Sequence, residues 1–401
     1  MITRKTEQKV LRQIRLQDSV SLLKRLIEIP GHRLLPEKEG KTSEYIAQWF
    51  ENEGVKVKTV DVMPGRPNVI AWIRGTGKGC SLMYNCHMDT VPEYGWASKP
   101  GPFEAVVEKG RVYGRGSCDM KGAIAAVMVA MRALANSGVE LGGDLIFAGV
   151  IGEEGEGSIG TRAIVEKGPK TDMAVVCEPT DLNVSIGHRG SSNLRLIVHG
   201  VPAHTAYPER GVNAILMMSK ILDVLDRKLS PKLRSKKHEL LGPATLTPAV
   251  IQGGMRTDVV PDLCETKLNC RYPKGQDPSQ IKREIEDVIG KLQKRYPQLK
   301  AEVEILSNAL GMEISREHPL VESLRNVMVK ISEKHPGIIG SGFWTDASIL
   351  MNQGGIPTAI FGPGKEEIAH TVMEYLDIEQ LHLAAQAYAL TALDICQRER
   401  N

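Results

Sequence analysis

Short apolar runs that alternate with helical segments are the sequence feature that most restricts the fold of this chain. NVIAWIRG, SLMYNC, DLIFAGVI, DMAVVC and PTAIFG are each bounded by turn residues. Such runs are typical of strands buried on both faces. MKGAIAAVMVAMRAL and DIEQLHLAAQAYALTALDICQ are helical in pattern, and Ser43 is an expected N-cap for a helix over residues 43–53. The alternation predicts an α/β fold with a mostly parallel sheet.

Between about residues 189 and 305 a different pattern of polar and apolar residues interrupts this alternation. SNLRLIVHG, TLTPAVIQGG, CETKLNCRY and AEVEIL alternate as half-exposed strands do, and two helical segments separate them, the second capped by Asp277. The order β-α-β-β-α-β is that of a ferredoxin-like α+β unit. Because 401 residues exceed the usual size of one core, we expect one domain over residues 1–188 and 306–401 and an inserted domain over residues 189–305.

Charge and apolar content exclude several classes of protein. Lys and Arg number 51 against 48 Asp and Glu, without a block of like charge that would follow a phosphate backbone, which argues against a nucleic-acid partner. No stretch of 18 apolar residues occurs, and the polar N-terminus lacks a signal-peptide core. Seven cysteines without a CxxC pair suit a reducing compartment. These features predict a cytoplasmic protein that does not enter a membrane.

Five side chains that can bind metal follow the ends of apolar strands or lie in the loops beyond them. In open α/β sheets the carboxyl ends of strands meet at one edge, so these side chains can share a site. Two imidazoles and three carboxylates suit zinc, cobalt or manganese, and a carboxylate between two ions can bridge them. A lone Asp or Glu at a strand end is usually a helix cap or a solvated turn residue, and it is the five together that indicate a site. The sequence therefore predicts a two-metal centre of His87, Asp119, Glu154, Glu178 and His370.

Two neighbouring features refine this centre. Glu153 and Glu154 are adjacent in a turn and so point in different directions, which lets one bind metal while the other acts as a base. Asp89 lies two residues beyond His87 in an extended segment, so it faces the same side and can orient the imidazole.

A dinucleotide site is the rival interpretation of the same region. Gly155 to Gly160 match G-x-G-x-x-G between a strand and a helix, and Glu178 lies near the position that would contact a ribose. Against this, Glu153 and Glu154 would place negative charge where a pyrophosphate binds.

Over nearly its whole length the chain resembles the metallopeptidase and deacylase family of acetylornithine deacetylase, succinyl-diaminopimelate desuccinylase, carboxypeptidase G and aminoacylase. The resemblance rests on NCHMDTVP, GRGSCDMKG, GEEGEGSIGT, CEPT, HGVPAHTAYPERGVNAI, the segment from Gly253 to Pro261, and AHTVMEY. It implies a catalytic domain with an inserted lid and dimerisation domain. It also implies two divalent metal ions, with zinc expected in preference to cobalt or manganese.

The resemblance assigns roles to individual residues. His87, Asp119 and Glu178 are expected to bind one metal, and Asp119, Glu154 and His370 the other, with Asp119 as the bridge. Glu153 is expected to be the general base, and Asp89 to orient His87. His204 matches a histidine that stabilises the tetrahedral oxyanion, commonly across a dimer interface.

Substrate contacts are implied for Arg271, Asn213 and Thr345. Arg271 matches an arginine that grips a substrate carboxylate, although a salt bridge on the sheet is the alternative. Thr345 and Asp346 resemble a turn near the substrate, and a helix cap explains them as well. Asp258 departs from the family pattern, in which many relatives carry Asn before the Val-Val-Pro segment.

The predicted function is removal of an acyl group from an N-acyl amino acid by attack of a metal-activated water, in a homodimer formed through residues 189–305. An exopeptidase acting on short peptides is the alternative. Glu178 favours deacylation, since in the family that the chain resembles members with Glu at this position are mostly deacylases and carboxypeptidases, whereas aminopeptidases more often carry Asp. A non-catalytic, metal-stabilised dimer that binds a ligand is a remote third interpretation, because the ligand set and the base are complete.

Overall fold

The computed structural model describes residues 3–97, 99–332 and 335–400, and the chain divides into two compact units. Unit 1 comprises Met1–Ile186, Ile314–Ile339 and Thr345–Asn401, and unit 2 comprises Gly187–Glu313 and Gly340–Trp344. The predicted insert over residues 189–305 falls inside unit 2. Unit 2 runs further because its last long strand continues to Ala309 and a short strand follows at Met312–Glu313.

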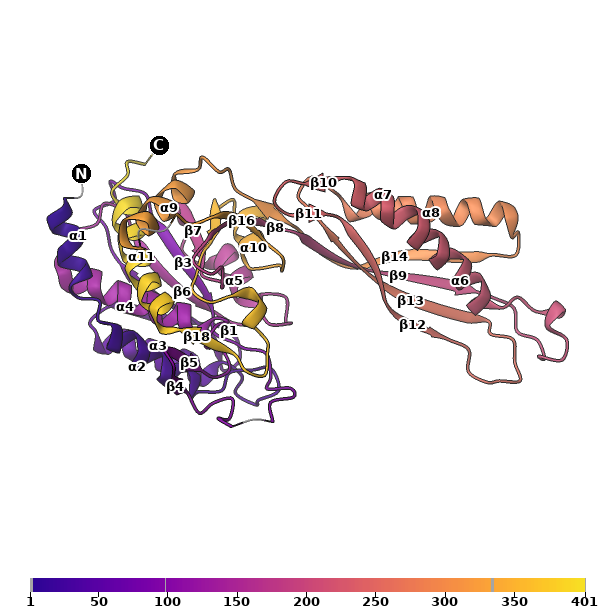
Figure 1. The fold of residues 1–401 in the computed structure, drawn as a ribbon, viewed down its shortest axis with the longest axis horizontal. Helices are drawn as coiled ribbons and strands as arrows, with labels where there is room; N and C mark the ends of the chain where they lie inside the picture. Colours follow the sequence, from indigo (N-terminus) through magenta and orange to yellow (C-terminus); the bar gives the residue numbers. More distant parts are fainter. Residues whose placement is uncertain (1–2, 98, 333–334, 401) are drawn as a thin grey trace. The chain divides into compact units, whose positions relative to one another are not determined.

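The sheet of unit 1 has parallel strands at its centre and antiparallel strands toward its edges (Figure 1). Strands β6, β3, β7 and β17 are mutually parallel, whereas β1, β2 and β8 pair antiparallel. This confirms the predicted α/β class with a largely parallel central sheet. In spatial order the strands are β1 (Lys56–Met63), β2 (Arg66–Ile73), β6 (Leu145–Val150), β3 (Leu82–His87), β7 (Met173–Val176), β17 (Thr358–Ile360) and β8 (Val184–His188), and β16 (Ile338–Ser341) also pairs with β8.

The core of unit 1 explains why its central strands β3 and β6 are mostly apolar. Every residue of β3 and β6 is buried, so helices cover both faces of these strands. Helix α4 is rich in Ala, Val and Met and is buried almost throughout, and it packs on α2, α11, β3 and β6. The helices are α1 (Arg4–Leu11), α2 (Leu16–Ile27), α3 (Gly40–Asn52), α4 (Lys121–Ser137), α5 (Ile159–Lys167), α9 (Pro319–Ser332), α10 (Ala347–Asn352) and α11 (Ile378–Cys396).

The expected cap of α3 is wrong. The helix begins at Gly40, and Ser43 lies inside its first turn, fully buried. Its hydroxyl donates to the backbone oxygens of Glu39 and Pro67 at 3.2 and 2.9 Å. The side chain therefore links the helix to the start of β2 instead of capping it.

A small second sheet in unit 1 joins segments that are far apart in the sequence. Strand β18 (Tyr375–Asp377) pairs with β5 (Arg111–Tyr113), which pairs with β4 (Val106–Glu108). This pairing brings the segment after His370 next to the segment before Asp119.

Unit 2 has the predicted ferredoxin-like topology. Its antiparallel sheet has the order β12-β13-β9-β14, and α6 and α8 pack on it around a buried core that includes Leu194, Met218 and Ile285. Asp277 caps α8 as expected, because its side chain accepts the N–H of Ser279. The elements are β9 (Gly190–His199), α6 (Ala214–Val224), α7 (Ser230–Ser235), β10 (Lys237–His238), β11 (Gly242–Pro243), β12 (Thr245–Gly253), β13 (Leu263–Tyr272), α8 (Pro278–Arg295), β14 (Lys300–Ala309) and β15 (Met312–Glu313).

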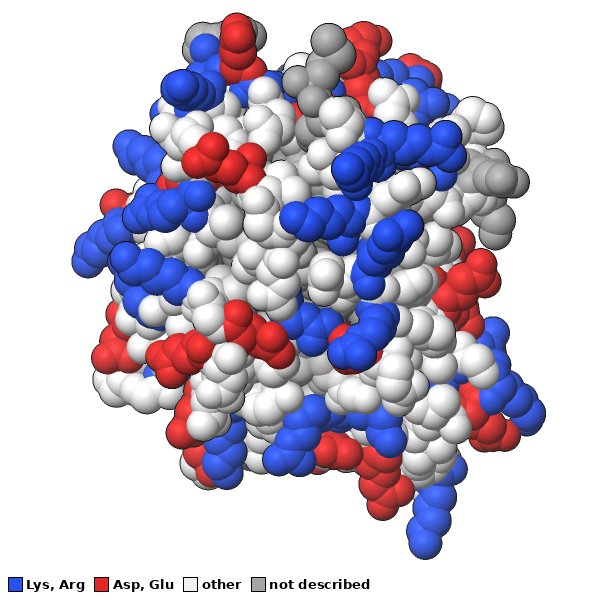
Figure 2. Space-filling view, turned by 90° about the vertical axis from the view of Figure 1, so that its left-hand side faces the viewer, with Lys and Arg blue, Asp and Glu red and all other residues white. Residues whose placement is uncertain are grey.

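The surface carries mixed charge. Across the face drawn in Figure 2, Lys and Arg side chains are interspersed with Asp and Glu, in line with a net charge of +3. Among the residues that the structure describes, no helix is both long and apolar enough to cross a bilayer.

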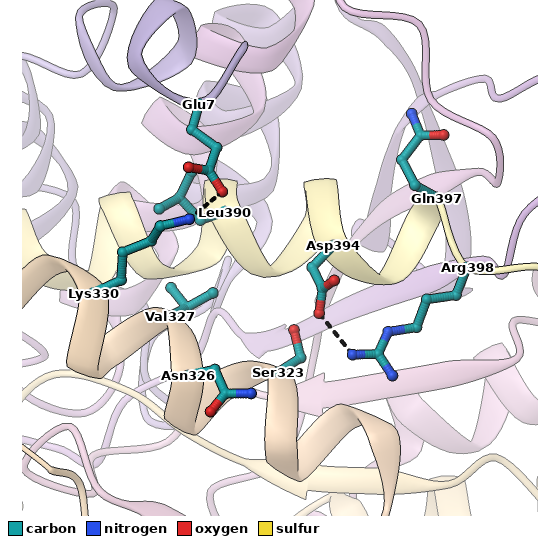
Figure 3. Close-up of a pocket in the computed structure, with 9 residues that line it drawn as sticks. All are labelled: Glu7, Ser323, Asn326, Val327, Lys330, Leu390, Asp394, Gln397 and Arg398. Carbon is teal, nitrogen blue, oxygen red and sulfur yellow. Dashed lines mark hydrogen bonds and ion pairs between the residues drawn. The ribbon is translucent and has the colours of Figure 1, made fainter. Parts of the chain in front are cut away.

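A groove of about 630 Å³ lies between α1, α9 and α11 (Figure 3). Ion pairs join Glu7 to Lys330 and Asp394 to Arg398 along its walls, and Val327 and Leu390 also line it, next to the first pair. None of the five predicted metal ligands lines this groove.

All seven cysteines are buried as free thiols. Burial raises the pKa of Cys270 to about 12, and it also raises the pKa of Cys80, Cys86 and Cys118. High pKa values keep thiols protonated and poorly reactive.

Candidate metal centre

Asp119 lies between two imidazoles. Its Oδ1 is 3.0 Å from Nε2 of His87, and its Oδ2 is 3.1 Å from Nε2 of His370. His87 is the last residue of β3, Asp119 precedes α4, and His370 lies before β18. One carboxylate thus presents a separate oxygen to each histidine, an arrangement that would let it bridge two ions with one oxygen on each.

Two glutamates complete the cluster, one beside each histidine. Glu154 follows β6, and its Oε1 is 2.8 Å from Nε2 of His370. Glu178 follows β7, and its Oε1 is 3.6 Å from Nε2 of His87. The structure therefore brings together all five side chains that the sequence places at strand ends.

The cluster concentrates negative charge where four of the five side chains are largely buried, while the side chain of His370 is 52% exposed. Burial lowers the pKa of His87, but the charges of Glu178 and Asp119 outweigh this effect and raise it well above its usual range. Hydrogen bonds with Asp119 and Glu154 raise the pKa of His370 to about 10. Burial and the charge of Asp119 raise the pKa of Glu178 to about 8. Each shift reflects a site whose anionic oxygens require positive charge.

This donor set fits divalent metal ions. One atom from each of His87, Asp119 and Glu154 lies within 4.8 Å of the other two. Nitrogen and carboxylate oxygen donors together suit zinc, cobalt and manganese. Two divalent cations would supply the positive charge that three carboxylates in one cluster need.

His87 is oriented by a different atom from the one expected. Its Nδ1 is 2.9 Å from the backbone oxygen of Asp89 and 3.7 Å from the carboxylate. An Nδ1–H that donates to this carbonyl leaves the Nε2 lone pair facing Asp119 and Glu178. The carboxylate of Asp89 instead accepts the backbone N–H groups of Glu153 and Glu154 at 3.2 and 2.8 Å. Asp89 therefore holds the loop after β6 as well as the imidazole.

Glu153 lies beside the cluster. Burial raises its pKa well above the usual range, and the negative charges of Glu178, Asp346 and Glu154 add to that effect. A carboxylate with a raised pKa is a stronger proton acceptor, which suits a general base.

Glu374 anchors the loop that carries Asp119, and it was not among the predicted site residues although it lies within the segment AHTVMEY. Its carboxylate accepts the backbone N–H groups of Gly116, Cys118 and Asp119 at 2.9–3.0 Å. Arg115 donates to it at 2.7 Å, and both side chains are only 1% exposed. A buried carboxylate with four donors fixes the backbone next to the bridging ligand.

Thr345 and Asp346 lie at the start of α10 and are buried. The hydroxyl of Thr345 accepts the N–H of Ala347 at 3.2 Å, a local turn contact, whereas the N-cap residue of α10 is Asp346, whose side chain does not cap the helix. Asp346 accepts from the hydroxyl of Thr161 at 2.7 Å, and Asn85 of β3 donates to the same hydroxyl. This polar chain connects α10 and α5 to the strand that ends in His87.

His204 and Asn213 belong to unit 2. The exposed His204 accepts the N–H of Ala206 on Nδ1 at 3.0 Å, which leaves a proton on Nε2 of the neutral ring. Asn213 is the N-cap of α6, and its side-chain oxygen accepts the N–H of Leu216.

Arg271 and Asp258 also belong to unit 2. Arg271, on β13, is partly buried and donates to Asn269 at 3.2 Å, while burial and the charge of Arg189 lower its pKa. Among the described residues no carboxylate pairs with it. The exposed Asp258 instead forms a two-point contact with Arg256 at 2.8 and 2.9 Å.

Comparison with known proteins gives one consistent family. Residues 83–394 match the peptidase family M20/M25/M40. The chain is 30% identical over 379 residues to an N-formyl-4-amino-5-aminomethyl-2-methylpyrimidine deformylase of Bacillus subtilis, covering 86% of this chain and 88% of that protein. Other relatives at 25–30% identity are named as succinyl-diaminopimelate desuccinylases and acetylornithine deacetylases.

Solved structures agree on the fold. An aminopeptidase of Bacillus cereus superimposes with a TM-score of 0.79 at 21% identity, over 96% of this chain and 100% of that one. A dinuclear metal-binding peptidase of Bacillus subtilis from the M20 family superimposes with a TM-score of 0.72 at 17% identity, over 94% and 97%. Together with the family match and the ligand cluster, these findings establish that the chain belongs to peptidase family M20/M25/M40 and is a metal-dependent hydrolase of amide bonds.

Proposed function

We propose that this enzyme is a deacylase that removes a small acyl group from an N-acyl amine or N-acyl amino acid. The bridging position of Asp119 between His87 and His370 is the observation that carries the proposal. The name of the deformylase relative supports a small acyl group such as formyl, and acetyl and succinyl are the other candidates that the resemblance provides.

In this proposal His87, Asp119 and Glu178 hold one divalent metal ion, and Asp119, Glu154 and His370 hold the other. Two zinc ions are the expected occupants, with cobalt or manganese as substitutes. When bound, the ions lower the pKa of a water molecule and supply positive charge opposite the substrate carbonyl oxygen.

Glu153 is the proposed general base. Its carboxylate takes a proton from the attacking water while a C–O bond forms at the substrate carbonyl carbon. The same group then delivers that proton to the amine nitrogen as the C–N bond breaks, giving a carboxylate and a free amine. The pKa of Glu153 is raised by burial, so it can hold this proton between the two steps.

Unit 2 is proposed to supply His204 for the oxyanion from the partner subunit of a homodimer. Nε2–H of His204 is a hydrogen-bond donor that Ala206 leaves free. The edge strand β12 supports a dimer through this unit, since Ile251 on this strand and Met255 just beyond it are more than half exposed. Arg271 and Asn213 are proposed substrate contacts.

A substrate screen tests the proposal. Protein reconstituted with zinc would be given N-formyl, N-acetyl and N-succinyl forms of amines and amino acids, together with dipeptides, and the released amine would be measured. We expect acyl substrates to exceed dipeptides in kcat/KM by at least about tenfold, which is about 1.4 kcal/mol of transition-state binding. Faster turnover of dipeptides would replace the deacylase proposal with the exopeptidase.

A matched variant separates catalysis from metal binding. Glu153→Gln removes the base and keeps the size of the side chain, so the zinc content should stay at the wild-type value while turnover is lost. Wild-type turnover by Glu153→Gln would exclude this residue as the base.

A further inference from the structure

The loop that carries Glu153 and Glu154 is rich in backbone conformations that favour glycine. Gly152, Gly155 and Gly157 have φ values of 71°, 96° and 74°. Glycine has more conformational freedom to lose than other residues, so an ordered Gly-rich loop needs restraints from its surroundings. Glu154 and Glu153 can stay in place only if the rest of the protein provides those restraints.

Arg66, the first residue of β2, provides one restraint at each end of this loop. Its Nε and Nη2 donate to the two oxygens of Glu39 at 2.8 and 2.7 Å, and Nη2 also donates to Glu156. Glu39 in turn accepts the backbone N–H of Gly152 at 3.1 Å. The guanidinium of Arg66 thus holds Glu156 directly and holds Gly152, at the start of the loop, through Glu39.

Burial makes this contact strong. The side chains of Arg66 and Glu39 are 9% and 1% exposed, so solvent screens their attraction little. Lys38 also pairs with Glu156 at 2.6 Å, but both of those side chains are 26% exposed and the contact is a single point. A planar guanidinium can bind one carboxylate with two nitrogens and still reach a second, which an ammonium group cannot do.

We propose that Arg66 is a positioning residue for the reaction, because through Glu39 and Glu156 it holds both ends of the segment from Gly152 to Glu156, which carries Glu153 and Glu154. Asp89 holds the same loop at the amides of Glu153 and Glu154, and Arg66 fixes the segments on either side. This inference rests on the proposed function, in which Glu154 is a metal ligand and Glu153 is the base.

Arg66→Lys tests the inference, with Arg132→Lys as the matched control. Arg132 is also a partly buried arginine of unit 1, with its side chain 15% exposed, and it pairs with Asp18 and Glu53 away from the loop. For Arg66→Lys we expect kcat to fall about 10- to 100-fold while KM changes less than about threefold, because small displacements of reacting groups have effects of this size. For Arg132→Lys, kcat per folded molecule should stay at the wild-type value.

Metal affinity provides a readout that does not depend on turnover. Titration of metal-free protein with Co²⁺, followed by its absorption, should show that Arg66→Lys weakens one of the two sites about tenfold, as changes to groups behind a ligand commonly do. Arg132→Lys should bind Co²⁺ like the wild type. Thermal unfolding would show the folded fraction of each variant.

If Arg66→Lys does not fold, Glu156→Gln provides a second test of the same contact. It leaves the pair between Arg66 and Glu39 intact and weakens only the far end of the loop, so it should fold and lower kcat by a smaller factor of about 3 to 10. Wild-type kcat and Co²⁺ affinity in every Arg66 and Glu156 variant that folds would overturn the inference.

Glu154→Gln distinguishes this failure from failure of the proposed function. If Glu154→Gln binds two Co²⁺ ions as tightly as the wild type, the proposed ligand set is wrong. If it loses one ion while Arg66→Lys behaves like Arg132→Lys, the ligand set stands and Arg66 has no positioning role.

Discussion

Glu374→Gln is the substitution that most directly tests how the loop before α4 is held. One carboxylate oxygen of Glu374 accepts from Arg115 and Gly116, and the other accepts from Cys118 and Asp119. An amide retains one acceptor oxygen and replaces the other by an NH₂ group. Whichever oxygen remains, two of the four donors lose their acceptor and face another donor.

The expected cost is set by the pair with Arg115. Both side chains are 1% exposed, and removing one partner of a buried ion pair costs about 3–5 kcal/mol because the other charge remains buried. The loss of one backbone bond adds about 1 kcal/mol. Since glutamine has the shape of glutamate and can keep one pair of bonds, we expect the free energy of unfolding to fall by about 4 kcal/mol.

Urea unfolding of the metal-free protein, followed by tryptophan fluorescence, measures this cost. Three of the four tryptophans belong to unit 1, namely Trp49, Trp72 and Trp96. Glu304→Gln is a suitable control, because its partner Arg195 and the carboxylate itself are 37% and 49% exposed and such pairs contribute at most about 1 kcal/mol. A cost below about 1 kcal/mol for Glu374→Gln would refute the view that this carboxylate holds the loop.

Three further predictions concern chemistry and pH. Glu153→Ala should lower turnover by several orders of magnitude with zinc content near wild type, measured by amine release and metal analysis, and unchanged turnover would exclude it as the base. His204→Asn should lower kcat by about 100-fold without loss of metal, because its proposed contact is made chiefly in the transition state, and an effect on KM alone would contradict this. Burial raises the pKa of Asp172, but hydrogen bonds from Ser81 and Arg400 outweigh it and bring the pKa below 3.8. Asp172 therefore adds stability above about pH 3.8 that is lost as the pH falls through its folded-state pKa. In Asp172→Asn the free energy of unfolding, measured by urea titration, should fall less steeply as the pH is lowered through this range.

The fold class and the side chains at or just beyond the ends of the parallel strands β3, β6 and β7 were predictable because both depend on local patterns. Strands buried on both faces are apolar runs, and the ends of parallel strands converge whatever the details of packing. His87 and Glu178 could be placed in one site for this reason alone. The roles of Glu153 and His204 stay predictions that the proposed experiments test.

Groups that act through distant partners could not be recognised. Arg66 meets Glu39 and Glu156, which are 27 and 90 residues away, and a single charged residue has no periodicity to mark it. Ser43 followed the pattern of a helix cap, but the contact with Pro67 that buries it is equally non-local. The group that orients His87 is the backbone carbonyl of Asp89. Every residue has such a carbonyl, so the sequence does not mark this one.

The seven buried thiols allow the opening of this protein to be followed by chemical labelling. Each cysteine is buried in the native structure, so a thiol reagent reacts mainly with molecules that have opened. Cys86 and Cys177 report on the centre of unit 1, whereas Cys264 and Cys270 report on the core of unit 2. The rates at which individual cysteines are labelled would therefore measure the opening of each unit separately, without any engineered probe.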